Sequence, residues 1–125
     1  MTFAYWCVLI AALMPLIWVG VAKSSLPGYD NDQPRRSLAG AEGRAQRAHW
    51  AEQNALEAFA PFAAGVIIAH LTGGAETLTI NVLAGLFIAA RIVHGAAYLA
   101  DRGPLRSFAW LAGMICIIGL FIAAA

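Results

Sequence analysis

Four apolar stretches, each long enough to cross a lipid bilayer, constrain what this chain can fold into. The first, residues 3–22, has no charged side chain and, at about 1.5 Å per helical residue, can span a hydrocarbon core about 30 Å thick. The others are residues 44–71, 77–100 and 105–125. With 61% hydrophobic and 12% charged residues, the chain is too apolar for a soluble domain of its size. We therefore expect an all-α membrane protein, with residues 1–125 forming a single antiparallel bundle of four transmembrane helices.

The first apolar stretch and the loop after it each leave two interpretations open. A secretory signal peptide competes for residues 3–22, because residues 19–22 are small enough to form a cleavage site. However, no positive residue precedes the stretch, and it is long for the apolar part of such a signal, so we expect a retained helix. Residues 23–43 form the one long loop, with turn-forming pairs such as Pro27-Gly28. This loop is either a solvated connector or a cap over a site at the membrane face.

The distribution of positive charge predicts the orientation of the bundle. Two short turns, residues 72–76 and 101–104, make the helices on either side of each turn antiparallel neighbours. All 8 lysine and arginine residues lie on the side of the long loop, or in the half of a helix nearest that side. The positive-inside rule places this side in the cytoplasm and both termini on the opposite side.

The helix expected at residues 44–71 carries a polar stripe into the membrane. At about 100° of rotation per residue, Arg47, Asn54 and Pro61 lie on one line. Trp50 and Glu57 lie beside that line. A polar stripe in hydrocarbon is costly unless it faces protein, a cavity or a ligand. The function of the chain therefore depends on what faces this stripe.

Polar groups on three of the expected helices fall in one layer, in the cytoplasmic third of the membrane. Glu57 and Arg91 each lie about 21 Å along a helix from the turn at residues 72–76, so we expect them to form an intramembrane ion pair. The other polar side chains of this layer are Arg47, Asn54, His94, Tyr98, Arg106 and Ser107. The layer holds more positive than negative charge and suits a small anion bearing carboxylates, with or without an ammonium group.

Taken singly, these side chains have ordinary structural explanations. Arg106 can extend to the lipid headgroups, and Tyr98, Trp50 and Trp110 suit the interfacial aromatic belt. His94 and Asn54 can simply pack between helices or hold them together. Their joint occurrence in one layer is what favours a binding site.

The remaining candidates for chemistry have only structural interpretations. Cys7 and Cys116 lie inside apolar runs, where we expect small buried hydrophobic residues. His70 and Asn81, near the far side of the membrane, are expected to pack between helices. The sequence has no Cys-x-x-Cys pair or cluster of cysteine and histidine, so it indicates no metal site. The formal net charge of +1 gives no indication of nucleic-acid binding.

Two segments carry patterns typical of one family of membrane proteins. Residues 44–49, RAQRAH, precede NALE at residues 54–57 and then Pro61, and residues 91–99, RIVHGAAYL, precede PLRS at residues 104–107. The first pattern is similar to an arginine-rich second helix with N-x-x-E-x-x-x-P, and the second to R-x-x-H-x-x-x-Y followed by P-x-R-S. Together they resemble the membrane-associated proteins in eicosanoid and glutathione metabolism, the MAPEG family. The likeness covers nearly the whole chain.

The resemblance implies a bacterial-type four-helix protomer, a homotrimer, and glutathione as a co-substrate bound between protomers near the cytoplasmic face. The implied glutathione-binding residues are Arg47, Asn54, Glu57, Arg91, His94 and Tyr98. The implied catalytic residues, beside the sulfur, are Arg106 and Ser107. In this arrangement Glu57 meets the amino group of glutathione, and the arginine stabilises the nucleophilic thiolate. The pattern departs from the family at Trp50 and Gln53, where members that use glutathione usually have arginine.

The resemblance favours a membrane glutathione-dependent transferase or peroxidase that detoxifies lipophilic electrophiles, in the bacterial inner membrane and in contact with its lipid. The alternative is a non-catalytic member of the same fold that binds lipid or serves as a scaffold. Four short spans with an intramembrane glutamate also resemble small proton-coupled exporters. Those exporters typically carry the acid in their first helix, and residues 3–22 contain none.

Overall fold

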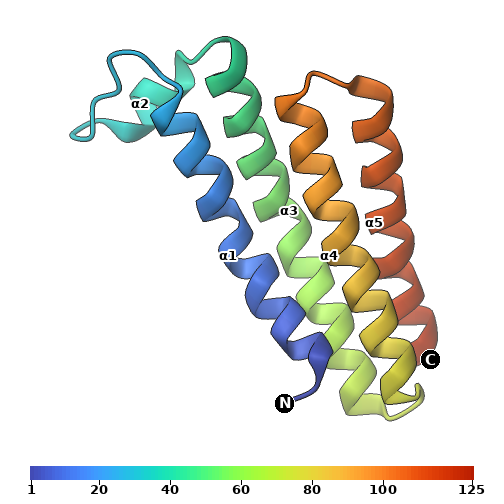
Figure 1. Ribbon diagram of the computed structural model, residues 1–125. Coiled ribbons are helices and arrows are strands. Elements are labelled where there is room, and N and C mark those ends of the chain that lie inside the picture. Colours follow the sequence, from blue (N-terminus) through green and yellow to red (C-terminus); the bar gives the residue numbers. More distant parts are fainter.

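The computed structural model, which describes residues 1–125, consists of four long helices and one short helix (Figure 1). The long helices are α1 (Phe3–Ser24), α3 (Gly43–Thr72), α4 (Thr77–Leu99) and α5 (Gly103–Ala124), and the short one is α2 (Pro34–Ala39). No strand is present, and each long helix is long and apolar enough to cross a membrane. The predicted fold class, an all-α membrane bundle, is confirmed.

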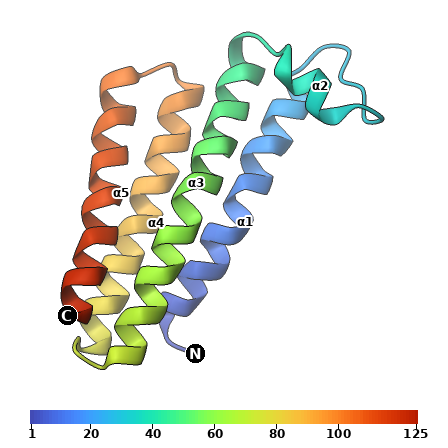
Figure 2. The same ribbon diagram turned by 180° about the vertical axis from the view of Figure 1, so that it is seen from behind.

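Helices α3 and α4 form the middle of the bundle. Helix α1 packs against both of them, and so does α5. Figures 1 and 2 show α1 and α5 on opposite sides of this central pair. Consecutive long helices run antiparallel, so both termini and the α3–α4 turn lie at one end, while α2 and the α4–α5 turn lie at the other.

The ends of the helices follow from local residue chemistry. Gly73 ends α3 in the left-handed conformation, with φ of 67°, which glycine adopts without steric cost. Asp101 makes the tight turn after α4 with φ of 55°, and Pro104 stands in the first turn of α5, where its missing N–H is not needed. Helix α3 continues through Pro61, so the polar stripe and the apolar half belong to one continuous helix.

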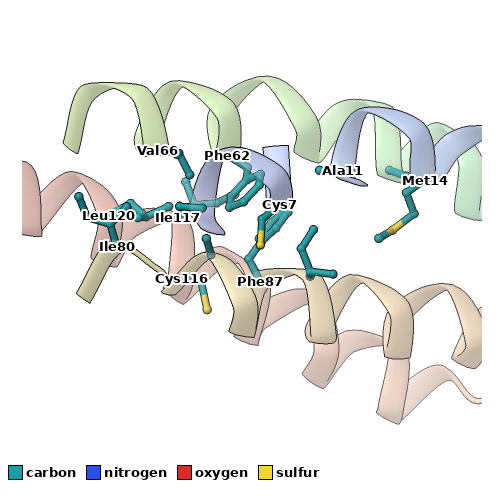
Figure 3. Packing of buried hydrophobic residues seen from close by; sticks show 14 of the residues in the cluster. Cys7, Ala11, Met14, Phe62, Val66, Ile80, Phe87, Cys116, Ile117 and Leu120 are labelled. Carbon is teal, nitrogen blue, oxygen red and sulfur yellow. The ribbon is translucent and has the colours of Figure 1, made fainter. Parts of the chain in front are cut away.

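The core is a cluster of 18 buried residues to which all four long helices contribute (Figure 3). Phe62 of α3 and Phe87 of α4 stack there, with ring centroids 3.9 Å apart. Helices in lipid associate through close packing rather than through the hydrophobic effect, and small residues permit that packing. The buried alanines of this cluster are Ala4, Ala11, Ala51, Ala55, Ala69, Ala84 and Ala124. Cys7 and Cys116 are also buried here, as free thiols.

Polar contacts tie the start of α1 to α3 and α4. Asn81 accepts a hydrogen bond through Oδ1 from the backbone N–H of Ala4, at 2.9 Å, which satisfies one of the free amides at the start of α1. Thr2 Oγ1 lies 2.9 Å from Nε2 of His70, whose Nδ1 lies 2.8 Å from the carbonyl oxygen of Val66. Because that carbonyl can only accept, Nδ1 donates in the neutral ring and Nε2 accepts from Thr2.

The segment expected to be a loop, residues 23–43, contains α2. Pro34 stands in the first turn of α2, a position that suits proline. Leu38 is buried against Ala22 of α1 and Ala48 of α3, in a small second core cluster. This contact holds α2 against the end of the bundle.

Gly95 of α4 allows α1 to approach closely, and this gives a test of the packing. A Cβ atom at Gly95 would overlap the indole ring of the buried Trp18. Gly95→Ala should therefore lower the melting temperature in detergent, because overpacking costs about 1–3 kcal/mol, which offsets the helix-propensity gain of up to about 1 kcal/mol. Gly20→Ala is the matched control, since a Cβ atom there meets nothing within 4 Å. If the two variants melted alike, the close packing of α1 on α4 would be refuted.

Candidate functional site

A buried arginine joins the two central helices. Arg91 of α4 is 4% exposed and donates a hydrogen bond from Nη2 to Oδ1 of Asn54 on α3, at 2.7 Å. A buried charge is costly unless it is paired or hydrogen-bonded. The side chain of Asn54 is therefore a structural partner of Arg91 as well as a candidate for ligand binding.

Tyr98 lies at the middle of a second group of contacts, among α3, α4 and α5. The ring of His94 meets the Tyr98 ring edge-on, with centroids 5.2 Å apart. The guanidinium carbon of Arg106 lies 4.6 Å from the centroid of the same ring, within the range of a cation–π interaction. The ring of Trp50 lies on another side, with its centroid 6.5 Å from that of Tyr98. Tyr98 thus holds Arg106 of α5 near the polar face of α3.

Two adjoining cavities open beside these contacts. The more polar cavity has a volume of about 290 Å³ and is lined by Trp50, Gln53, Asn54, Glu57 and Tyr98. The second has a volume of about 200 Å³ and is lined by Asn54, Glu57, Ala58, Pro61, Trp110 and Met114. Because both share Asn54 and Glu57, a single ligand can reach from the polar cavity into the more apolar one.

The expected ion pair between Glu57 and Arg91 is not formed. The one contact between an acidic and a basic side chain within ion-pair distance joins Nδ1 of His49 and Oε2 of Glu52 on α3, at 2.9 Å, and it does not involve Glu57 or Arg91. Arg91 bonds to Asn54 instead, and Glu57 is exposed on α3, where it lines both cavities. Matching depth on two helices does not fix the direction of a side chain, and Asn54, one turn away from Glu57, is the residue that faces Arg91.

Six of the eight predicted site residues either line a cavity or contact a residue that does: Asn54, Glu57, Arg91, His94, Tyr98 and Arg106. Arg47 and Ser107 line neither cavity. Arg47 is partly buried on α3, and its Nε has no hydrogen-bond partner. Ser107 follows Arg106 on α5 and is exposed.

The buried ring of His94 also has an unpartnered nitrogen. His94 is 2% exposed, and its Nδ1 forms no hydrogen bond within the chain. Buried polar atoms are nearly always hydrogen-bonded. Two buried side-chain nitrogens have no hydrogen-bond partner, His94 Nδ1 and Arg47 Nε. Both belong to residues that the sequence predicted for ligand binding.

Some residues that line the cavities were not predicted as site residues. Trp50 and Gln53, the two departures from the family pattern, line the polar cavity. Trp110 and Met114 of α5 line the second cavity. They lie four and eight residues after Arg106, so the helical spacing of one face could have indicated them.

These features define an integral membrane protein whose four-helix bundle carries a polar, partly aromatic cavity beside three of its helices. The profile of the MAPEG family matches residues 3–125, and the chain belongs to this family of membrane proteins of eicosanoid and glutathione metabolism. The family indicated by the two sequence segments is thus confirmed. No curated protein and no solved structure matches the chain.

The hydrogen bond between Arg91 and Asn54 predicts a specific loss of stability. Asn54→Ala leaves the buried guanidinium without its acceptor and should lower the free energy of unfolding by about 1.5–3 kcal/mol. Thermal unfolding in detergent, followed by circular dichroism, measures the change. Arg44→Ala is the control, because Arg44 is exposed on the same helix and exposed positions usually change stability by less than about 0.5 kcal/mol. Equal losses in the two variants would show that the bond does not stabilise the bundle.

Proposed function

We propose that this protein is a membrane glutathione-dependent transferase or peroxidase that acts on lipophilic electrophiles. The family supports a role in glutathione or eicosanoid metabolism. The observation that carries the finer proposal is the position of Arg106, with its guanidinium carbon 4.6 Å from the centroid of the Tyr98 ring. Tyr98 in turn lines the polar cavity together with Asn54 and Glu57. A positive charge thus lies next to a cavity that offers a carboxylate and an amide.

The residues at the cavity fit the chemistry of glutathione, which has an ammonium group, two carboxylates, two amides and a thiol. Glu57 makes no ion pair within the chain, so its carboxylate is available to the ammonium group. The Oδ1 of Asn54 is occupied by Arg91, which leaves its NH₂ group to donate to a carbonyl or carboxylate. The hydroxyl of Tyr98 and the unpartnered Nδ1 of His94 add further polar atoms at this level.

The bound co-substrate supplies the thiol, whose thiolate form attacks an electrophile or reduces a peroxide. A neighbouring cation favours the thiolate over the thiol, and Arg106 supplies a permanent positive charge for this purpose. Ser107, the next residue, adds a hydroxyl donor on the same turn of α5. The apolar wall of the second cavity, formed by Pro61, Trp110 and Met114, offers an electrophile a path from the bilayer.

The proposal includes a homotrimer. Gln53 and Glu57 are exposed on a membrane-spanning helix, and polar groups at such positions almost always face protein or water. A second copy packed against this face of α3 would cover both residues and close the open side of the cavities. Cavities of about 290 and 200 Å³ in the single chain lie at or below the usual size of ligand pockets, roughly 300–1,000 Å³, which also favours a site completed by a neighbour.

The function is tested by the thiolate absorbance of glutathione titrated into the detergent-solubilised protein. Wild-type protein should produce thiolate, and Arg106→Ala should reduce it at least tenfold because the neighbouring cation is lost. Arg102→Ala is the control, since Arg102 is an exposed arginine that lines neither cavity. Absence of glutathione binding at millimolar concentration would refute the proposal. Binding without turnover of any electrophile would favour a non-catalytic member of the fold.

We further propose that the protein lies in the bacterial inner membrane with α2 in the cytoplasm, as the positive-inside rule indicates. Because Cys7 and Cys116 are buried, a single introduced cysteine can report the orientation. Ala39→Cys, at the exposed end of α2, should react with a membrane-impermeant maleimide only after the cells are opened. Glu76→Cys, in the opposite turn, should react in intact cells. The reverse pattern would overturn the orientation.

A further inference from the structure

An apolar groove runs along α4 and α5, two helices that lie side by side in Figures 1 and 2. It has a volume of about 440 Å³ and is lined by 10 residues, all of them hydrophobic. The large side chains of Leu86, Phe108 and Ile115 are exposed along it, whereas Ala89 and Ala112 contribute only methyl groups. Because the groove belongs to two helices that can span a membrane, it is suited to hold hydrocarbon rather than water.

The groove lies on the other side of the α4–α5 pair from the two polar cavities. At about 100° per residue, Phe108 lies about 200° around α5 from Arg106, and Val93 lies about 200° around α4 from Arg91. The groove residues of both helices thus face away from the polar contacts. A second copy that covers the cavity face of α3, as in the proposed homotrimer, would leave this groove open to lipid.

The length of the groove matches one leaflet of a bilayer. On α5 it extends from Leu105, next to the α4–α5 turn, to Cys116. These 11 residues span about 16 Å along the helix, close to half of a hydrocarbon core about 30 Å thick. A transmembrane helix of a partner would need a groove about twice as long. A lipid acyl chain that enters from the membrane face needs only this length.

A cavity with two charged side chains adjoins the groove at the membrane face. It has a volume of about 400 Å³, is lined by residues 101–105, and shares Leu105 with the groove. Its charges are the carboxylate of Asp101 and the guanidinium of Arg102, both exposed and neither of them in an ion pair within the chain. A guanidinium suits a phosphate, and a carboxylate suits an ammonium group.

We propose that the groove and this cavity together bind one phospholipid with an ethanolamine headgroup. The acyl chain lies in the groove, the phosphate meets Arg102, and the primary ammonium group donates to Asp101. A choline headgroup has the same charges but no N–H to donate, and a glycerol headgroup has no positive charge for Asp101. The site is separate from the one proposed for glutathione, so either can exist without the other.

The headgroup assignment is tested by native mass spectrometry of the detergent-solubilised protein, incubated with equal amounts of phosphatidylethanolamine and phosphatidylcholine of identical acyl chains. The wild type should retain about two- to fivefold more of the ethanolamine lipid, the range for an exposed ion pair. Asp101→Asn should bring the ratio to about one, and asparagine tolerates the φ of 55° at this position. Glu76→Gln, which removes an exposed carboxylate from the opposite turn, should leave the ratio unchanged.

The same experiment tests the groove. Ala89→Phe places a ring in the groove at an exposed position, so it should reduce the retained amount of both lipids several-fold. Ala12→Phe is the matched control, because Ala12 is exposed on α1 and does not line the groove, and it should retain lipid as the wild type does.

Three results would overturn the proposal. Equal retention of the two lipids by the wild type, or an unchanged preference in Asp101→Asn, would refute the headgroup assignment. Equal retention by Ala89→Phe and Ala12→Phe would show that the lipid lies elsewhere. A second polypeptide, lost together with Ala89→Phe, would show that the groove binds a protein. Failure of glutathione to bind would refute the proposed function and leave the lipid site standing.

Discussion

The buried guanidinium of Arg91 is the constraint on which the rest of the polar region depends. The side chain of Arg91 is only 4% exposed, and water cannot solvate its charge between membrane helices. The bundle must therefore supply a hydrogen-bond partner. Asn54 does so from α3, and the 2.7 Å bond fixes the rotation and register of α3 against α4. With that register set, Glu57 lies one turn from Asn54 and Tyr98 lies two turns from Arg91, which brings both to the cavity wall.

The frame that holds this register is made of small residues. Apolar side chains gain little by leaving lipid for a helix interface, so close contact must supply the attraction. Gly95 lets the indole of Trp18 lie against α4, and buried alanines line much of α1, α3 and α4. The stacked rings of Phe62 and Phe87 fill the space between the two central helices. Close packing through small residues therefore holds the helices together, and the polar layer does not have to contribute all of that attraction.

Much of the fold could be predicted because its determinants are local. The lengths of the apolar runs predict the four transmembrane helices. Two turns of only a few residues make the helices on either side of each turn antiparallel neighbours. The depth of a residue also follows from sequence, so the polar layer could be predicted. The direction in which each side chain points could not be predicted, because it depends on how each helix is rotated in the packed bundle. Hence Asn54, and not Glu57, meets Arg91. Helix α2 was missed because its six residues lie among turn-forming pairs and carry too little periodicity.

Because the hydrogen-bond partner of Arg91 is neutral, the carboxylate of Glu57 is left without an ion pair. An ion pair between Arg91 and Glu57 would cancel both charges and leave the cavity wall neutral. A hydrogen bond to Asn54 satisfies the guanidinium through a neutral oxygen, so the carboxylate of Glu57 stays unpaired and faces the cavity. The charge that is buried in the bundle and the charge that lines the cavities are thereby carried by different helices, Arg91 by α4 and Glu57 by α3. An unpaired carboxylate on a membrane helix is unfavourable without a ligand or a neighbouring protein surface. The same arrangement that stabilises the pair of central helices therefore leaves a carboxylate that a ligand or a neighbouring protein surface would stabilise.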